Sequence, residues 1–214
     1  MYLGKFALVM AVLLAGTPAA AEVIEVRDDG FIIRAVATVS ASQREVWLKL
    51  TKPADWWSGE HTWSGDAANM TLTPQAGGCF CETIPGEDDD SGFKLNGSVA
   101  HATVLLANPL KLLRMEGGIG PLQSEPARGI LTYALKPIDG GTMIQMEYAY
   151  GGSMRYKPAE MAPTVDKVLT QQLAQLQAAL GALTDGAAAE AAPTDDDAEE
   201  PSLEAQIDAL GTQE

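Results

Sequence analysis

Segments in which apolar and polar residues alternate dominate the middle of the chain and predict β-strands. The first is 31–39, FIIRAVATV, where β-branched residues are concentrated. Six later segments have a similar character and are separated by short polar or glycine-containing turns: 70–74, 79–85, 97–107, 110–118, 129–137 and 142–152. Asp139-Gly140, between the last two, is a strong hairpin signal. Because such short connections join antiparallel neighbours, we expect one antiparallel sheet of about seven strands.

A helical period replaces this alternation towards the end of the chain. Apolar residues recur there at spacings of three and four, at Val165, Val168, Leu169, Leu173, Leu176, Leu180 and Leu183. This predicts one long amphipathic helix, entered through Pro158 or Pro163. Two short helices are expected after the first strand, one over 43–50 behind Ser40 and Ser42 as possible caps, and a second, or a turn, starting at Pro53.

The order of these elements predicts an α+β fold. A sheet with one apolar face needs a partner, and the terminal helix is the only large apolar surface that the sequence offers. We therefore expect a curved sheet wrapped around that helix. Where the two diverge, an apolar cavity would remain, which is the usual architecture of a small-molecule site.

The two ends of the chain differ from this central domain. Residues 1–21 combine Lys5, a short apolar run and the small residues Ala19-Ala20-Ala21, which predicts a signal peptide cleaved before Glu22 and a periplasmic or secreted protein. The run is too short to span a bilayer, so no stable membrane insertion is expected after cleavage. Residues 185–214 hold ten acidic residues and no basic one, which predicts a disordered acidic tail with a possible protein partner.

Charge excludes some partners of the remaining domain, 22–184. The formal net charge is −15, and the domain is acidic even without the tail. Nucleic acid needs a basic face, so we predict no nucleic-acid partner. Anionic membrane surfaces are disfavoured for the same reason.

Residues 55–67, DWWSGEHTWSGDA, hold three of the four tryptophans and one of the two histidines, and we call this segment the tryptophan loop. Its two glycines argue against a regular element. Trp57 and Trp63 either close one end of the fold as core or form the wall of a ligand site, since buried aromatic rings each remove a large apolar area from water. His61 is a candidate for facing the site.

Four polar residues lie within otherwise apolar segments: Glu82, His101, Arg114 and Gln172. A buried polar group without a partner costs about 1–3 kcal/mol, so each needs a protein partner, water or a ligand. Arg114 is expected to pair with Glu82 or Glu116 at the surface. His101 is a possible general base. Gln172 is placed on the apolar stripe of the long helix.

Cys79 and Cys81 fall on one face of a predicted strand. A disulfide between them would have to distort that strand, because i and i+2 Cα atoms are about 6.6–6.8 Å apart in it. Packing as two small apolar side chains is the preferred interpretation, and a soft-metal site together with His101 is the alternative. The acidic run 87–90 lacks the spacing of a calcium loop. We predict neither a metal nor a cofactor.

Several local patterns resemble one known family. They are Val46-Trp47, Gly77-Gly78-Cys79-Phe80, GPLQ at 120–123 and VDKVLTQQLAQL at 165–176. In this order they resemble the SRPBCC or START-like superfamily from Phe31 to Leu183, and within it an exported bacterial branch described as polyketide cyclase/dehydrase-like or Hsp90-ATPase-activator-like. The resemblance implies a helix-grip fold and an apolar ligand such as a lipid, sterol or polyketide. A minority of the superfamily are enzymes, with no shared catalytic residues.

Three hypotheses follow for function. The first is an exported protein that binds a small hydrophobic molecule between sheet and helix. Its expected ligand-binding residues are Trp57, His61, Trp63, His101, Tyr148, Tyr150, Leu169, Gln172, Leu173 and Leu176. The second is a cyclase or dehydratase, with His101 or His61 as base and Glu82, Tyr148 or Tyr150 as acid. The third is a protein-interaction domain of the co-chaperone kind.

Overall fold

The computed structural model describes residues 20–87 and 92–183. Most of the predicted signal peptide and all of the predicted acidic tail, 185–214, lie outside these residues, and so do residues 88–90 of the acidic run 87–90.

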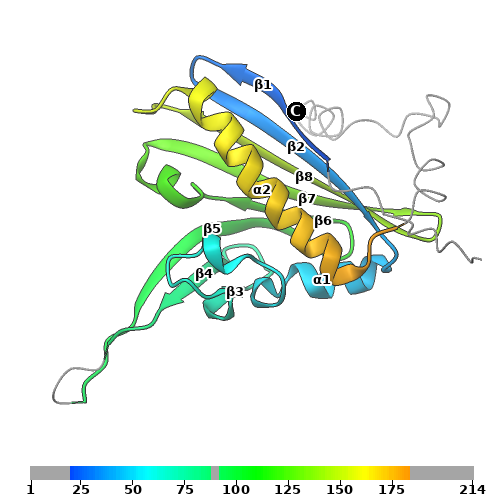
Figure 1. The fold of residues 1–214 in the computed structure, drawn as a ribbon, viewed down its shortest axis with the longest axis horizontal. Helices are drawn as coiled ribbons and strands as arrows, with labels where there is room; N and C mark the ends of the chain where they lie inside the picture. Colours follow the sequence, from blue (N-terminus) through cyan, green and yellow to red (C-terminus); the bar gives the residue numbers. More distant parts are fainter. Residues whose placement is uncertain (1–19, 88–91, 184–214) are drawn as a thin grey trace, which may run out of the picture.

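The fold is α+β, with one curved antiparallel sheet and a long C-terminal helix, as predicted for a helix-grip arrangement. The eight strands are adjacent in the order β1-β2-β8-β7-β6-β5-β4-β3. Their bounds are β1 (Ala20–Arg27), β2 (Gly30–Val39), β3 (Met70–Leu72), β4 (Cys79–Ile84), β5 (Gly97–Asn108), β6 (Leu112–Glu116), β7 (Ala127–Ile138) and β8 (Gly141–Gly152). The long helix α2 (Pro158–Leu180) crosses one face of the sheet diagonally (Figure 1).

Strand β1 is an addition to the predicted set. It pairs with β2 through a tight turn that brings Arg27 opposite Gly30. The segment is short and largely exposed, and its first residues are the small alanines expected at a signal-peptide cleavage site, so it lacks the apolar face that revealed the other strands. Its register with β2 slips between Val23 and Glu25, which is a β-bulge at the edge of the sheet.

The short helices follow β2, as predicted, and there are more of them. Helix α1 (Gln43–Leu50) begins with a capping box in which the Ser42 side chain accepts from the Glu45 backbone and the Glu45 carboxylate accepts from the Ser42 backbone. The 3₁₀ turn η1 (Pro53–Asp55) starts at the proline that predicted it. A further 3₁₀ turn, η2 (Gly59–His61), lies within the tryptophan loop, and another, η3 (Ala67–Asn69), begins where the loop ends.

The core lies between α2 and the concave face of the sheet. Over residues 129–135 of β7 and 141–150 of β8, buried and partly exposed residues alternate, so each strand presents one face to the helix. The apolar stripe of α2 covers that face and packs mainly against β1 and β2. Leu169, Leu173 and Leu176 are fully buried at this contact. The helix starts at Pro158 and continues through Pro163.

Candidate functional site

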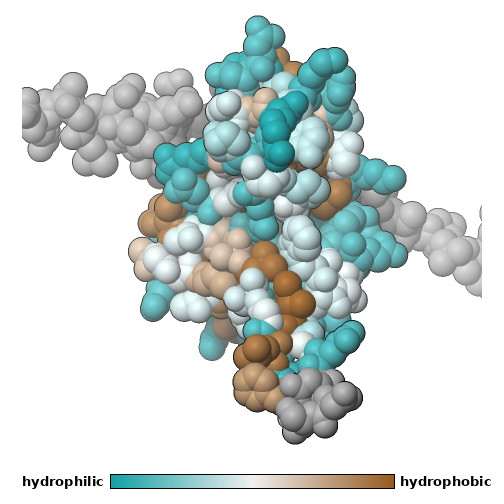
Figure 2. All heavy atoms as spheres, turned by 90° about the vertical axis from the view of Figure 1, so that its left-hand side faces the viewer, coloured by the Kyte–Doolittle hydropathy of each residue, from teal (hydrophilic) through white to brown (hydrophobic). Residues whose placement is uncertain are grey.

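A cavity lies at the N-terminal half of α2. Its volume is about 340 Å³, its lining is mostly apolar, and it is partly open to solvent. Five segments form it: α2, the tryptophan loop, the adjoining strands β4 and β5, and the 3₁₀ turn η4 (Gly120–Ser124). The N-terminal half of α2, β4 and β5 lie towards the left of Figure 1. The side of the molecule that Figure 2 turns towards the viewer carries several apolar patches.

Burial separates the lining residues into a floor and a rim. The floor residues are buried: Trp57, Phe80, His101, Leu122, Val165 and Leu169. The rim residues are exposed and include Glu60, Trp63, Pro121 and Thr164. Among the residues that line the cavity, only Glu60 has a carboxylate and none is Lys or Arg. The site is therefore an apolar cleft with few polar groups, and it has no cationic side chain.

The tryptophan loop divides its rings between core and rim. Trp57 is buried, packs edge-on against Phe80 with ring centroids 5.3 Å apart, and donates its indole N–H to the carbonyl of His61 at 3.1 Å. Trp63 is 55% exposed, so it stands at the mouth of the cavity. Trp57 therefore belongs both to the core and to the cavity wall, whereas Trp63 belongs only to the wall.

A buried carboxylate holds both His101 and the tryptophan loop. Glu82, on β4, is 1% exposed, and its carboxylate accepts hydrogen bonds from the backbone N–H groups of Trp63 and Ser64. The same carboxylate lies 2.9 Å from Nε2 of His101, which is 5% exposed on β5. Burial raises the pKa of Glu82, but these hydrogen bonds together outweigh it and leave the pKa below its ordinary value. Glu82 is therefore ionised near neutral pH.

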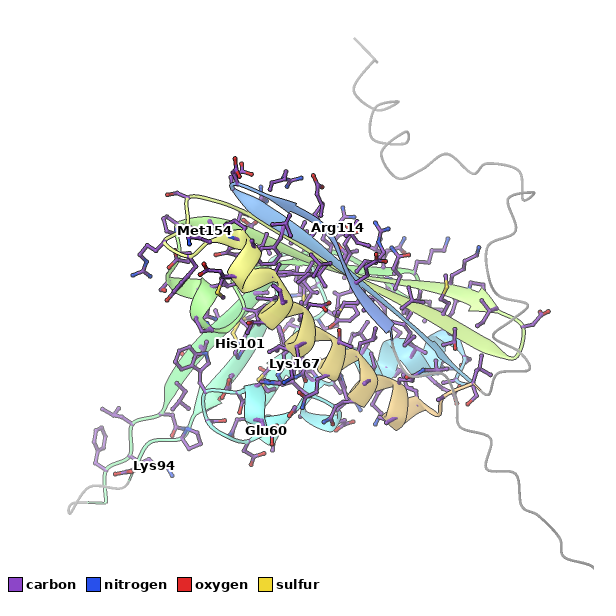
Figure 3. The ribbon with its side chains drawn as sticks, turned by 45° about the horizontal axis from the view of Figure 1, so that its top comes forward. Glu60, Lys94, His101, Arg114, Met154 and Lys167 are labelled. Carbon is purple, nitrogen blue, oxygen red and sulfur yellow. A yellow bond between two sulfur atoms is a disulfide. The ribbon has the colours of Figure 1, made fainter. Side chains whose placement is uncertain are left out.

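These contacts define which nitrogen of His101 is left to accept a hydrogen bond. An ionised carboxylate can only accept, so Nε2 of His101 must carry the proton and donate it to Glu82. In the neutral imidazole the other nitrogen, Nδ1, is then an acceptor. No hydrogen bond to Nδ1 occurs among the described residues. Figure 3 shows His101 on the same side of α2 as Glu60 of the tryptophan loop.

In His61 the other ring nitrogen, Nδ1, is the one already engaged, and its partner is Gln172. The side-chain oxygen of Gln172 accepts from the backbone N–H of Ser58 at 2.8 Å, so its amide nitrogen must be the atom that lies 2.6 Å from Nδ1 of His61. That nitrogen donates, and Nδ1 of His61 accepts. The proton of the neutral ring is therefore on Nε2, which is a donor. Gln172, fully buried on α2, positions His61 without lining the cavity itself.

A disulfide joins Cys79 and Cys81, so the expectation of two separate thiols is wrong, and so is the alternative in which they bind a metal. Their Cα atoms are 5.3 Å apart, closer than the about 6.6 Å of a regular strand. The predicted cost, a distorted strand, is present. Phe80 pairs with Ala102 but Cys81 pairs with Ala100, which leaves His101 as the extra residue of a β-bulge. Cys79 pairs with Thr103 rather than with His101.

The bulge gives β5 two consecutive inward residues. Both His101 and Ala102 are buried, whereas regular alternation would turn one of them outward. Bulges re-aim side chains in this way and are frequent beside functional sites. The direction of His101 thus depends on the irregular pairing next to the disulfide.

Turn η4 forms the wall opposite the tryptophan loop, and two predicted site residues hold it from below. Tyr148 donates to the carbonyl of Gly117 at 3.0 Å, and Tyr150 donates to the carbonyl of Leu122 at 2.9 Å. Burial raises the pKa of both phenols. Because their hydroxyl protons are engaged with η4 and its approach, neither tyrosine lines the cavity or is placed to serve as an acid. Gly129 leaves room for the Tyr148 hydroxyl, which a Cβ would meet at 2.3 Å.

The loop before α2 is fastened to η4 by charge. Glu125, whose side chain is buried, accepts from the Arg155 guanidinium and from the Arg155 backbone N–H. The guanidinium hydrogen bond holds the pKa of Glu125 below its usual range. This ion pair positions the first turn of α2 beside η4.

The structure sorts the predicted site residues into three groups. Five of them line the cavity: Trp57, His61, Trp63, His101 and Leu169. Glu82 and Gln172 lie behind the lining residues and orient His101 and His61 through hydrogen bonds. Tyr148, Tyr150, Leu173 and Leu176 are buried but do not line the cavity. The two tyrosines support η4 from below, and the two leucines fill the interval between the sheet and the C-terminal half of α2. Arg114 pairs with neither Glu82 nor Glu116 and instead donates to Thr132 at 3.2 Å.

Sequence reasoning missed the η4 wall and part of the helix wall. GPLQ at 120–123 was noticed as a family pattern, but nothing in its composition indicated a ligand site. Met161 and Thr164 precede the apolar stripe from which the helix was predicted, and they line the mouth.

Among the described residues, no group of three or more His, Cys, Asp or Glu side chains could hold a metal ion. None of the helices in that part of the chain is both long enough and apolar enough to cross a membrane.

Comparisons with known proteins supply no family. No protein-family model matches the chain, and no curated protein matches it either. Solved structures of bacterial proteins do match, among them a protein from Mesorhizobium loti with 20% identity, a TM-score of 0.46 and coverage of 70% of this chain and 96% of that one. An uncharacterized protein from Rhizobium leguminosarum has 16% identity, a TM-score of 0.49 and coverage of 77% and 98%. CalU16 from Micromonospora echinospora has 16% identity, a TM-score of 0.48 and coverage of 75% and 86%. These values assign this chain neither a ligand nor an activity.

Proposed function

We propose that the protein binds a small, mostly apolar molecule in the cavity between the N-terminal half of α2 and the sheet. The observation that carries this proposal is the cavity of about 340 Å³ beneath one half of a helix whose other half is packed against the sheet. A volume in this range, an apolar lining and a few oriented polar groups are typical of small-molecule sites. Membership of the SRPBCC or START-like superfamily, which the sequence patterns suggest, is part of the same proposal.

Export through the predicted leader completes the proposal. The Cys79–Cys81 disulfide supports it, because disulfides persist in oxidising compartments and are rare in the cytosol. Cell fractionation followed by mass measurement of the N-terminus tests it. A periplasmic or secreted form that begins at Glu22 is expected, and an uncleaved cytosolic form would contradict it.

Ligand binding can be tested by filling the cavity. Val168 lines it, so Val168→Trp should place an indole in the ligand's space. Leu105→Trp is the matched control, because Leu105 is an exposed residue of β5 that does not line the cavity. The probe is N-phenyl-1-naphthylamine, an uncharged dye whose fluorescence rises in apolar surroundings. Native mass spectrometry of the protein purified from its own host provides a second readout.

Wild type and Leu105→Trp should both bind the dye and carry a co-purifying molecule, and Val168→Trp should do neither while unfolding at a similar denaturant concentration. Dye binding that survives in Val168→Trp would show that the cavity is not the site.

A proton-transfer enzyme is the second candidate. The observation that favours it is that both histidines line one cavity and that a buried, ionised carboxylate orients His101. A base oriented by a carboxylate in an apolar site is an arrangement used in general base catalysis. The test is hydrogen–deuterium exchange at acidic C–H positions of a co-purified molecule in D₂O. Exchange that is accelerated by wild type and lost in His101→Phe would support catalysis, and no acceleration would leave a binding protein.

A further inference from the structure

The two histidines restrict the polarity of the molecule that the cavity can accept. Resting on the proposed function, we infer that the ligand is a neutral, apolar molecule that carries a hydroxyl group, and that this hydroxyl donates to Nδ1 of His101. A phenol or an alcohol has this chemistry, and a fatty-acid carboxylate does not.

His101 lies on the buried floor of the cavity. It is the one polar residue among the buried lining residues, where its ring packs against Phe80 with centroids 5.3 Å apart. A group that reaches the floor therefore meets apolar side chains and a single polar nitrogen. A buried polar atom without a partner is costly, so a ligand that satisfies Nδ1 is favoured over one that only displaces water from it.

Glu82 sets the direction of any hydrogen bond between a ligand and His101. Glu82 accepts from two backbone N–H groups and from Nε2 of His101, so the proton of the neutral ring is committed to Nε2. Nδ1 can then only accept, and the ligand must supply the hydrogen. The carboxylate behind the ring increases the electron density at Nδ1 and so strengthens this bond.

The lining of the cavity contains no positively charged Lys or Arg side chain. Glu82 lies behind the floor and Glu60 stands on the rim. Moving an isolated carboxylate from water into such a site has a large desolvation cost with no opposite charge to offset it. An anionic ligand is therefore disfavoured by the same residues that favour a hydroxyl.

His61 supplies the complementary contact. Nδ1 of His61 accepts from Gln172, so Nε2 of His61 donates. His61 is half-buried and therefore lies nearer the mouth than the floor. A carbonyl or ether oxygen at the outer part of the ligand would accept from it. The ligand thus enters with its hydroxyl first and leaves any accepting oxygen towards the mouth.

Three naphthalenes of similar size test this inference: 2-naphthol, 2-methylnaphthalene and 2-naphthoate. A methyl group has nearly the volume of a hydroxyl but cannot donate, and the carboxylate is an anion. Wild-type full-length protein should bind 2-naphthol at least about fivefold more tightly than 2-methylnaphthalene, although the methyl compound is the more hydrophobic, and should bind 2-naphthoate most weakly. Displacement of N-phenyl-1-naphthylamine measures all three.

The preference should depend on His101. In His101→Phe, which keeps an aromatic ring beside Phe80, the ratio between 2-naphthol and 2-methylnaphthalene should fall to about one or below. In Glu25→Gln, which removes an exposed charge on β1 that does not line the cavity, the ratio should stay as in wild type. The comparison of the three compounds on wild type stands by itself if His101→Phe does not fold.

Each outcome separates this inference from the proposed function. Equal binding of 2-naphthol and 2-methylnaphthalene, or tightest binding of 2-naphthoate, would overturn the hydroxyl assignment and leave the cavity as a ligand site. Failure of all three compounds and of the dye to bind would overturn both.

Discussion

The two halves of α2 have the same kind of apolar stripe and end in different surroundings. In the C-terminal half, Leu173 and Leu176 are fully buried, and Gln177 donates to the carbonyl of Thr38. In the N-terminal half, Val165 and Val168 face a cavity of about 340 Å³. The helical period is therefore a guide to which face turns inward, but it does not tell whether that face meets side chains or space.

The difference arises from what lies opposite each half. The C-terminal half approaches α1, and the chain after it returns to β2 through the pairing of Ala182 with Val39. The N-terminal half faces η4 and the tryptophan loop, which stand apart because Glu82, Tyr148, Tyr150 and Arg155 fasten each of them to the sheet or to the loop before α2. Polar anchors thus keep the space open.

The largest effect on stability is expected from truncating one apolar side chain in each half of α2. Leu176→Ala should destabilise the protein by about 3 kcal/mol, because it leaves a new void in packed core. Val168→Ala should cost about 1 kcal/mol, because it enlarges a space that already exists and removes a partly exposed side chain. Urea unfolding of both variants measures this. Equal losses would mean that the N-terminal half is packed as well.

The anchor at Glu82 should have the next largest effect. Near neutral pH, Glu82→Gln should destabilise the protein by roughly 2 kcal/mol. Each carboxylate oxygen of Glu82 accepts from one backbone N–H group, and in glutamine one of these oxygens becomes an NH₂ donor. Because the folded-state pKa of Glu82 lies below 4.5, this stability is present above pH 4.5 and is lost as the pH falls through the folded value.

The stability difference between wild type and Glu82→Gln should therefore shrink below pH 4.5. Urea unfolding near neutral pH and below pH 4.5 measures this difference. Glu60→Gln, on the exposed rim, is the control, and its stability should change little under both conditions. A difference that is constant with pH would mean that Glu82 does not act through its charge.

The disulfide should contribute less. Replacing both Cys79 and Cys81 with Ser should cost about 1.5 kcal/mol, the chain-entropy value for so short a loop. It should also weaken dye binding, because the bulge that turns His101 inward is no longer enforced from β4. Wild type treated with a dithiol reductant should behave like the double variant. Unchanged dye binding in both would show that the bulge persists without the bridge.

The smallest stability effect is expected at the mouth. Trp63→Ala should change the unfolding free energy by less than about 0.5 kcal/mol, because the side chain is more than half exposed. Dye affinity should nevertheless fall several-fold, since Trp63 covers the bound molecule. Fluorescence titration and urea unfolding together measure this, and a large stability loss would place Trp63 in the core.

The sequence revealed the fold through its periods and the site only through exceptions to them. The seven predicted strands and the long helix follow from alternation and from spacings of three and four. Gln172 and Glu82 were noticed because polar residues interrupt those patterns, and both prove to be buried anchors. Their partners could not be predicted, since they lie 111 and 19 residues away and depend on how the strands are paired.

The position of His101 illustrates the limit most clearly. Regular alternation predicts whether a residue faces in or out only while the register is regular. The slip at Phe80 and Cys81 moves one residue of β5 out of that count. A bulge depends on two strands at once, and neither strand alone carries a pattern that indicates it.

Both outer strands of the sheet discourage the addition of another chain. At one side β1 carries a bulge between Val23 and Glu25, with charged Glu22 and Arg27 beside it; at the other, β3 is only three residues long. Open sheets expose unpaired backbone groups there, and short, charged or irregular edges are poor templates for intermolecular pairing. The protein can thus keep its sheet unclosed around α2, and its cavity accessible, without inviting fibrous self-association.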